Sequence, residues 1–442
     1  MNDIDSIFAW ICDLPDCPHA GPSKRKLAAG PSNKVRQLAS PPASFEENED
    51  ENMASTPKRR RLGNSRVFDP DATPRPGISS PGSLSRSTSE ASSTRSVNSS
   101  TKRQMMDLRL SETGVECKAL NVDAAPNAAQ GLVNTIDEIG RAVDILPHAL
   151  ELTIIEKVNE RKLDVRKWRY SFSSGDDDGL PGRIPTFEEV EKLLRKAKEC
   201  QEFNHEEASW NNQVHLRLLE SIFEEPIGGQ CDSFNAVSCT TARPHREFKL
   251  ASTPVKMIDM CIYASTDGDA ELSASIRKFC STTPTRAVNH TDFEPISMRP
   301  LLLSIETKRP GVNWDTAQLQ IGAWHAAQWS FLRWAVGEKI LRQRAEEGIE
   351  IPQTDEEQRA FEANKLAALS TLGFIPGIIV QGHRWLLVLS TYEDGKTKLW
   401  ADHQFGTTQS YLEIYAAVAG MRQLTGWGRD VYIPWFTANV LG

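Results

Sequence analysis

Apolar residues are spaced in different ways along the chain, and the spacing changes near residue 125. Before that point Ser, Pro, Asn and charged residues dominate, and the apolar residues show no regular spacing. Beyond it, three stretches repeat apolar residues at helical intervals, which places them on one face of a helix. In the second stretch, Thr186 followed by Glu189 forms the capping box that marks a helix start. The pattern predicts helices at residues 131–146, 186–201 and 205–223.

Apolar runs typical of strands follow these helices. Three strands are predicted, at residues 234–243, 255–264 and 300–308. The remaining chain is predicted to form a long helix at 315–348, strands within 377–406 that turn at Glu393-Asp394-Gly395, and a last helix at 409–424. The stretch at 266–297 is interpreted as an inserted loop. A helix, three strands, a helix and further strands, in that order, favour one mixed α/β domain.

The first 125 residues are expected to form a disordered arm, with the folded domain at residues 126–442. A segment so poor in apolar residues cannot bury enough surface to offset the entropy lost on ordering. The arm contains a basic run, Lys58, Arg59, Arg60 and Arg61. This run is typical of a nuclear localisation signal bound by an import receptor, although a solvated charge run has the same composition. We expect the protein in the nucleus, and otherwise in the cytoplasm.

Composition narrows the class of protein further. No apolar run approaches the length of a membrane span, and the acidic N-terminus lacks the pattern of a secretory signal, so we expect no membrane partner and no secretion. The eight cysteines include no C-x-x-C pair, which argues against a disulfide framework or a zinc ribbon. The formal net charge of −8 argues against a protein that coats nucleic acid. An acidic protein can still bind nucleic acid at one place, because such binding needs only a strip of basic side chains.

Charged residues end the apolar strand predicted at 300–308. Glu306 and Lys308 lie two positions apart, so their side chains point to the same face of that strand. The Glu-x-Lys spacing alone means little, because it recurs at Glu116-Cys117-Lys118 in the expected arm and at Glu160-Arg161-Lys162 in a charged helix. Its context must therefore decide whether Glu306 and Lys308 form a site.

The preceding strand provides that context. Asp259 stands alone among the apolar residues of 255–264, where an ionised carboxylate needs a partner. If the two strands pair antiparallel, Asp259 lies across from Glu306, and the two carboxylates repel unless a cation lies between them. Oxygen ligands of this kind suit Mg²⁺ or Mn²⁺. Lys308, on the same face, is positioned to orient a water or to offset charge on a phosphate.

Asp259, then Glu306-x-Lys308 on the next strand, then a long helix, resembles the signature of the PD-(D/E)XK nuclease superfamily. Over about residues 130–435, and in "IETKRPG…AQLQIGAWHAAQ" in detail, the chain is similar to a fungal nuclease-like family with a disordered, basic N-terminal arm. The resemblance implies a restriction-endonuclease-like core of a helix, a three-stranded antiparallel meander, a helix and a further strand, with extra N-terminal helices. One departure is Ile258, where the superfamily often has proline before the aspartate.

The resemblance also implies roles for residues outside the strands. Some branches, notably the recombination exonucleases, carry a glutamine followed four residues later by an aromatic residue, and Gln320 and Trp324 have that spacing on one helix face. Gln320 would then be catalytic and Trp324 a supporting residue. The superfamily's first-helix glutamate has three candidates, Glu206, Glu207 and Glu220, of which we favour Glu207.

Our hypothesis from the sequence is a metal-dependent phosphodiesterase acting on nucleic acid, DNA more than RNA. Asp259 and Glu306 would bind Mg²⁺ or Mn²⁺, Lys308 would position the attacking water, and Gln320 and Glu207 would support them. The alternative is a catalytically inactive module of the same fold that binds or scaffolds partners in the nucleus. The acidic charge favours this alternative, whereas the intact set of Asp259, Glu306 and Lys308 disfavours it.

Overall fold

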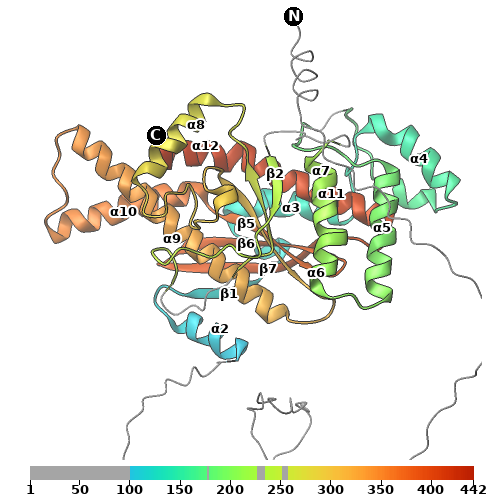
Figure 1. The fold of residues 1–442 in the computed structure, drawn as a ribbon, viewed down its shortest axis with the longest axis horizontal. Coiled ribbons are helices and arrows are strands. Elements are labelled where there is room, and N and C mark those ends of the chain that lie inside the picture. Colours follow the sequence, from blue (N-terminus) through green and yellow to red (C-terminus); the bar gives the residue numbers. More distant parts are fainter. Residues whose placement is uncertain (1–99, 177–178, 226–233, 251–256) are drawn as a thin grey trace, which may run out of the picture. The chain divides into compact units, whose positions relative to one another are not determined.

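A seven-stranded sheet forms the centre of the compact unit that spans Ser92–Gly442 (Figure 1). The computed structural model describes residues 100–442 except 177–178, 226–233 and 251–256, so the basic run at 58–61 lies outside the described residues. The strands are β1 Val115–Ala119, β2 Phe234–Ser238, β3 Met260–Ala264, β4 Leu301–Lys308, β5 Ile375–Gln381, β6 Arg384–Glu393 and β7 Lys396–Thr407.

Strand pairing in this sheet is mostly antiparallel. The spatial order is β1-β7-β6-β5-β4-β3-β2, and only the β1–β7 and β4–β5 pairs are parallel. Strands β2, β3 and β4 form an antiparallel meander. The β6–β7 hairpin turns at Asp394 and Gly395, whose φ angles of 53° and 76° suit the tight turns favoured by hairpins. The predicted meander, the further strand beside it and the turn at Asp394-Gly395 are confirmed.

Helices cover both faces of the sheet (Figure 1). They are α2 Thr101–Leu110, α3 Gln130–Gly140, α4 Glu151–Glu160, α5 Phe187–Glu202, α6 Glu207–Trp210, α7 Leu216–Phe223, α8 Ala270–Thr282, α9 Trp314–Glu346, α10 Asp355–Leu372, α11 Tyr411–Trp427 and α12 Ile433–Phe436. None of the helices in the described ranges is both long and apolar enough to span a bilayer.

Alternation along β5 shows how the two helix layers share the sheet. Ile379 belongs to a buried cluster with residues of α9, such as Ile321, whereas its neighbours Ile378 and Val380 belong to the larger core with α3, α5 and α11. Because successive strand side chains point to opposite faces, the first half of α9 covers one face together with α2, and α3, α5 and α11 cover the other. The result is a three-layer arrangement with β4 and β5 in its interior.

Several predicted helices are confirmed, including the capping box at Thr186 and Glu189 that opens α5 and the long helix α9. The expected start of order near residue 125 is wrong, because α2 and β1 precede it and β1 pairs with β7. The strand β1 is short and only partly buried, so it depends on its partner and leaves little apolar pattern. The stretch at 266–297 is not a loop throughout, since it contains α8.

Close packing of α11 on β7 gives a test of this arrangement. A Cβ added at Gly406 of β7 would lie 2.6 Å from both N and Cα of Ala417 in α11, which are backbone atoms. We expect Gly406→Ala to lower the free energy of unfolding by about 1–3 kcal/mol through overpacking. Urea unfolding followed by tryptophan fluorescence measures it.

Gly131→Ala in α3 is the matched control, because a Cβ there meets nothing within 4 Å. We expect it to be neutral or to stabilise by up to about 1 kcal/mol, since alanine favours a helix over glycine. Equal effects of the two substitutions would contradict the packing described.

Candidate active site

Two charged side chains are buried at the end of strand β4. All eight residues of β4 are buried; Glu306 is 0% exposed and Lys308 6%. Glu306 pairs with Ile379 of β5, which packs against α9, so Glu306 and Lys308 project from the sheet face covered by that helix. A strand interior of this kind tolerates charge only where partners compensate it.

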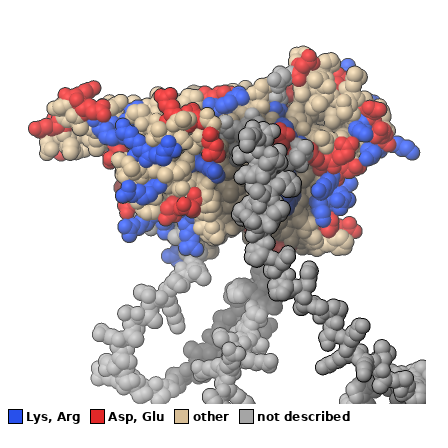
Figure 2. All heavy atoms as spheres, turned by 45° about the horizontal axis from the view of Figure 1, so that its top comes forward, with Lys and Arg blue, Asp and Glu red and all other residues tan. Residues whose placement is uncertain are grey.

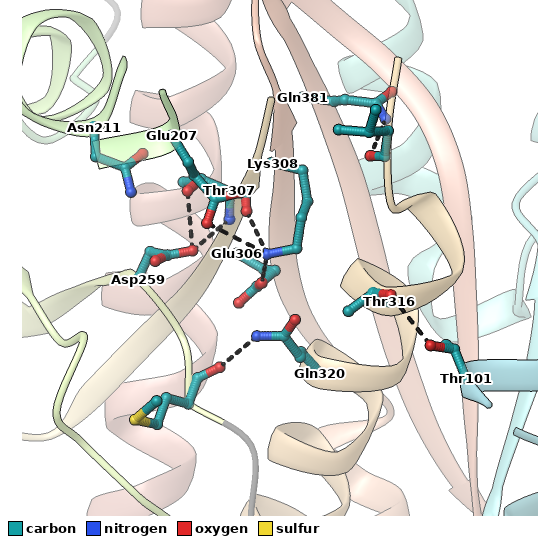
Figure 3. Close-up of polar contacts among 12 residues, drawn as sticks. Thr101, Glu207, Asn211, Asp259, Glu306, Thr307, Lys308, Thr316, Gln320 and Gln381 are labelled. Atoms are coloured by element: carbon teal, nitrogen blue, oxygen red, sulfur yellow. Dashed lines mark hydrogen bonds and ion pairs between the residues drawn. The ribbon is translucent and has the colours of Figure 1, made fainter. Parts of the chain in front are cut away.

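Asp259 lies directly across from Glu306. It immediately precedes β3, and the pairing of Met260 with Ile305 carries the register on to Asp259 and Glu306. The Asp259 Oδ2 accepts hydrogen bonds from the backbone N–H of Thr307 (2.8 Å) and from its hydroxyl (2.9 Å), as Figure 3 shows. The antiparallel pairing predicted for these strands is confirmed, and Thr307 fixes the carboxylate. The sequence analysis did not single out Thr307. Its only signal in the sequence is that a residue with a hydroxyl group stands between Glu306 and Lys308.

The ammonium of Lys308 lies among oxygen atoms. Its Nζ donates to Glu306 Oε1 (2.5 Å) and to the Thr307 carbonyl oxygen (2.7 Å), and lies 3.7 Å from Glu207 Oε1. Glu207 opens helix α6 and is partly exposed. The other candidate glutamates have different partners, Glu206 with Arg309 and Glu220 with Arg217. Of the three, Glu207 therefore lies at the site.

Gln320 and Trp324 have different surroundings. The Gln320 Nε2 donates to the carbonyl oxygen of Met257, two residues before Asp259, so it ties helix α9 to the segment that carries this carboxylate (Figure 3). Trp324 is fully buried in a cluster with Cys261 and Leu301, and its ring meets His290 edge-on at 4.5 Å between centroids. Gln320 is placed beside the carboxylates, whereas Trp324 supports the strands from within the core.

The electrostatics of the cluster follow from this crowding. Burial raises the pKa of Glu306 well above its usual value, the carboxylate of Asp259 adds to the rise, and Lys308 opposes it. Burial also raises the pKa of Glu207. For Lys308, burial acts to lower the pKa, but Glu306, Glu207 and Asp259 outweigh it and the net shift is upward. Without a cation, the site holds more carboxylate charge than one ammonium can balance.

A divalent metal ion fits this set of oxygen atoms. Glu306 Oε2 is buried and has no hydrogen-bond partner among the described residues, and the strand register sets Asp259 opposite Glu306. Within the same described ranges, no group of three or more His, Cys, Asp or Glu side chains is arranged to hold a metal by itself. Two carboxylates completed by water or substrate oxygens are the usual protein contribution to a Mg²⁺ site.

Comparison with known families agrees with the geometry. A family model described as the PD-(D/E)XK nuclease superfamily matches residues 154–433, and the chain belongs to that superfamily. The seven-stranded, mostly antiparallel sheet with its helices is consistent with a restriction-endonuclease-like fold, as the sequence predicted. Members of the superfamily typically use divalent metal ions, and the family supports nuclease activity in general. No curated protein and no solved structure matches the chain.

The raised pKa of Glu306 makes a prediction about stability in the absence of metal. Between the usual carboxyl value of 4.5 and the higher folded value, the folded chain binds more protons than the unfolded chain. The contribution of Glu306 to the free energy of unfolding therefore falls as pH rises through this window. We expect Glu306→Gln, measured by urea unfolding in EDTA, to gain at least about 1 kcal/mol relative to wild type between about pH 5 and pH 8.

Glu116→Gln is the matched control, because Glu116 begins another Glu-x-Lys triplet, in strand β1 at the edge of the same sheet. Its stability should follow that of wild type across the same pH range. A difference between Glu306→Gln and wild type that stays constant with pH would contradict the prediction.

Proposed function

We propose that this chain is a metal-dependent phosphodiesterase that hydrolyses nucleic acid, with DNA as the preferred substrate. The observation that carries the proposal is the register that sets Asp259 opposite Glu306, with the Lys308 ammonium 2.5 Å from Glu306. These three groups meet at the ends of adjacent strands in a chain of the nuclease superfamily. Burying the Glu306 carboxylate and the Lys308 ammonium beside the partly exposed Asp259 has no evident role in packing, since apolar residues would stabilise the strand as well.

Asp259 and Glu306 would hold Mg²⁺ or Mn²⁺, which supplies positive charge that acidifies water and offsets charge on a phosphate. Residues of the chain itself would position the carboxylates and the attacking water. Thr307 orients the Asp259 carboxylate, and Gln320 holds the segment before it through the Met257 carbonyl. Lys308, on the same face as Glu306, would donate to the attacking water or to a phosphate oxygen.

The distribution of surface charge favours contact with nucleic acid at one place over contact across a wide basic surface. On the face shown in Figure 2, basic and acidic side chains are interspersed. Arg309 directly follows the site and is partly exposed, with Glu206 as its ion-pair partner. Because exposed pairs of this kind are weak, the Arg309 guanidinium is available for a phosphate. The proposal therefore places substrate contact at the site itself.

Cleavage assays test this proposal. Single- and double-stranded DNA and RNA are incubated with wild type in Mg²⁺, Mn²⁺ or EDTA. We expect metal-dependent cleavage that falls by at least about a hundredfold in Glu306→Gln and in Lys308→Ala, because each loses a group that stabilises the transition state. Lys118→Ala, in the Glu-x-Lys triplet of β1, is the matched control and should cleave like wild type.

Calorimetric titration with Mg²⁺ or Mn²⁺ separates the two functions that the sequence left open. We expect binding to wild type and much weaker binding to Glu306→Gln. If wild type binds no metal and cleaves none of the substrates, the inactive binding module becomes the better interpretation. Cleavage that survives Lys308→Ala would place the activity elsewhere.

We also propose that the basic run at Lys58, Arg59, Arg60 and Arg61 directs the protein to the nucleus through an import receptor. The proposal rests on composition, because these residues lie outside the described part of the chain. Replacing all four by alanine in the full chain fused to a fluorescent protein should move the signal from nucleus to cytoplasm. The four-lysine version is the control that keeps the charge, and an unchanged distribution in the alanine variant would contradict the proposal.

A further inference from the structure

A cavity of about 270 Å³ adjoins the candidate active site. Two segments line most of it: the turn that ends helix α5, with Gln201, Asn204 and His205, and the loop that follows β4, with Arg309 and Pro310. Its volume lies just below the roughly 300–1,000 Å³ of sites for drug-sized molecules. The cavity therefore suits a chemical group smaller than such a molecule.

Two ion pairs connect the cavity to the active site. At the start of α6, Glu207 lies 3.7 Å from the Lys308 ammonium (Figure 3). The residues next to these two in the chain, Glu206 and Arg309, form a second pair at 3.1 Å, and Arg309 lines the cavity. Trp210, another lining residue, follows Glu207 by about one helical turn. A substrate whose phosphate binds at Lys308 therefore has its neighbouring nucleoside beside the cavity.

Contacts within the fold hold the β4 side of the cavity in place. Pro310 packs on Gly382, where an added Cβ would lie 2.4 Å from the proline ring. Gln381 Nε2 donates to the carbonyl oxygen of Val312 (3.0 Å), and Val312 also lines the cavity. This wall exists before a ligand binds, so little ordering opposes binding.

The α5 side of the cavity is held in place as well. Asn204 has a left-handed φ of 47°, and the backbone N–H of His205 donates to the carbonyl oxygen of Cys200 (2.9 Å). Cys200 and Trp210 are buried and belong to one apolar cluster, whereas Gln201 and Asn204 are exposed. The cavity therefore combines an apolar floor with side-chain amides at its rim.

The charge around the cavity favours a neutral ligand. Of the described residues that line it, only Arg309 carries a permanent charge, and Glu206 pairs with it. A phosphate group is usually held by several charged or backbone donors. An apolar floor with amides at the rim matches a nucleobase instead, since a base has apolar faces and a hydrogen-bonding edge.

We propose that this cavity is a subsite for one unpaired nucleobase of the substrate, next to the phosphodiester that is cleaved. The base lies against the apolar floor, and the amides of Gln201 and Asn204 bind its edge. A base inside a duplex reaches such a cavity only by leaving the stack. The substrate class is therefore single-stranded or locally unpaired nucleic acid. This inference rests on the proposed nuclease activity and deepens it.

Cleavage of an end-labelled single strand, with products resolved bond by bond, tests the inference. The strand carries one abasic nucleotide. We expect wild type to cut one bond beside that nucleotide at least about tenfold more slowly than more distant bonds, because the base that fills the cavity is missing there. Val312→Phe fills the cavity from its rim. It should lower kcat/KM about tenfold at every bond and show no further drop at the abasic nucleotide.

Val431→Phe is the matched control, because Val431 is 40% exposed, Val312 is 38% exposed, and Val431 does not line the cavity. It should keep both the wild-type rates and the drop at the abasic nucleotide. Gln201→Ala is a second variant, at an exposed helix position where no side chain is enlarged. We expect it to lower kcat/KM about fivefold through the lost hydrogen bond.

Three results would overturn the inference and leave the nuclease activity standing. They are wild-type cleavage that is uniform along the abasic strand, wild-type rates in folded Val312→Phe, and cleavage of duplex without cleavage of single strands. Urea unfolding shows whether Val312→Phe folds; if it does not, wild-type rates in Gln201→Ala overturn the inference in its place. Wild type that cleaves no substrate overturns the proposed function, and the inference with it.

Discussion

The carboxylate of Glu306, on a fully buried strand, determines which charged groups must lie around it. Glu306 projects from β4 in the interior of the sheet, where an unpaired charge would cost several kcal/mol. Lys308, two residues further on the same face, is its nearest counter-charge, but that ammonium is shared with the Thr307 carbonyl and approached by Glu207. Glu306 Oε2 keeps no partner among the described residues. The site is therefore built around a charge that the chain itself leaves only partly compensated.

The sheet topology brings the other groups to this carboxylate. Because β3 runs antiparallel to β4, the residue just before β3 meets the end of β4, and Asp259 arrives opposite Glu306. Because β5 runs parallel to β4, the β5–β6 turn lies beside Lys308, where Gly382 donates to the Lys308 carbonyl and accepts from His215. Strand order and direction thus connect the helix bearing Glu207 to the same strand end.

Sequence reasoning located the cluster where chemistry and local pattern coincide. A lone aspartate in an apolar strand and two charges at the end of another predicted that Asp259, Glu306 and Lys308 lie together, as the structure places them. Their metal-binding and catalytic roles stay predictions of sequence reasoning. It failed where tertiary contact decides: β1 is ordered by pairing with β7, and its own five residues carry little apolar signal. Thr307 was missed for a related reason, since its importance lies in hydrogen bonds to Asp259, which is distant in the sequence.

The charge of the cluster connects stability with function. Glu207, Asp259 and Glu306 face the Lys308 ammonium, and burial together with the charge of Asp259 raises the pKa of Glu306, so the metal-free site favours a proton on this group up to a higher pH than usual. A divalent cation would satisfy the same oxygen atoms without the proton. It would also give an acidic chain a local positive charge at the place where the phosphate of the proposed substrate would bind. The excess of carboxylate charge that destabilises the metal-free fold is therefore the same feature that would bind the metal ion and, through it, the substrate. A module that only binds partner proteins would gain nothing from this buried charge.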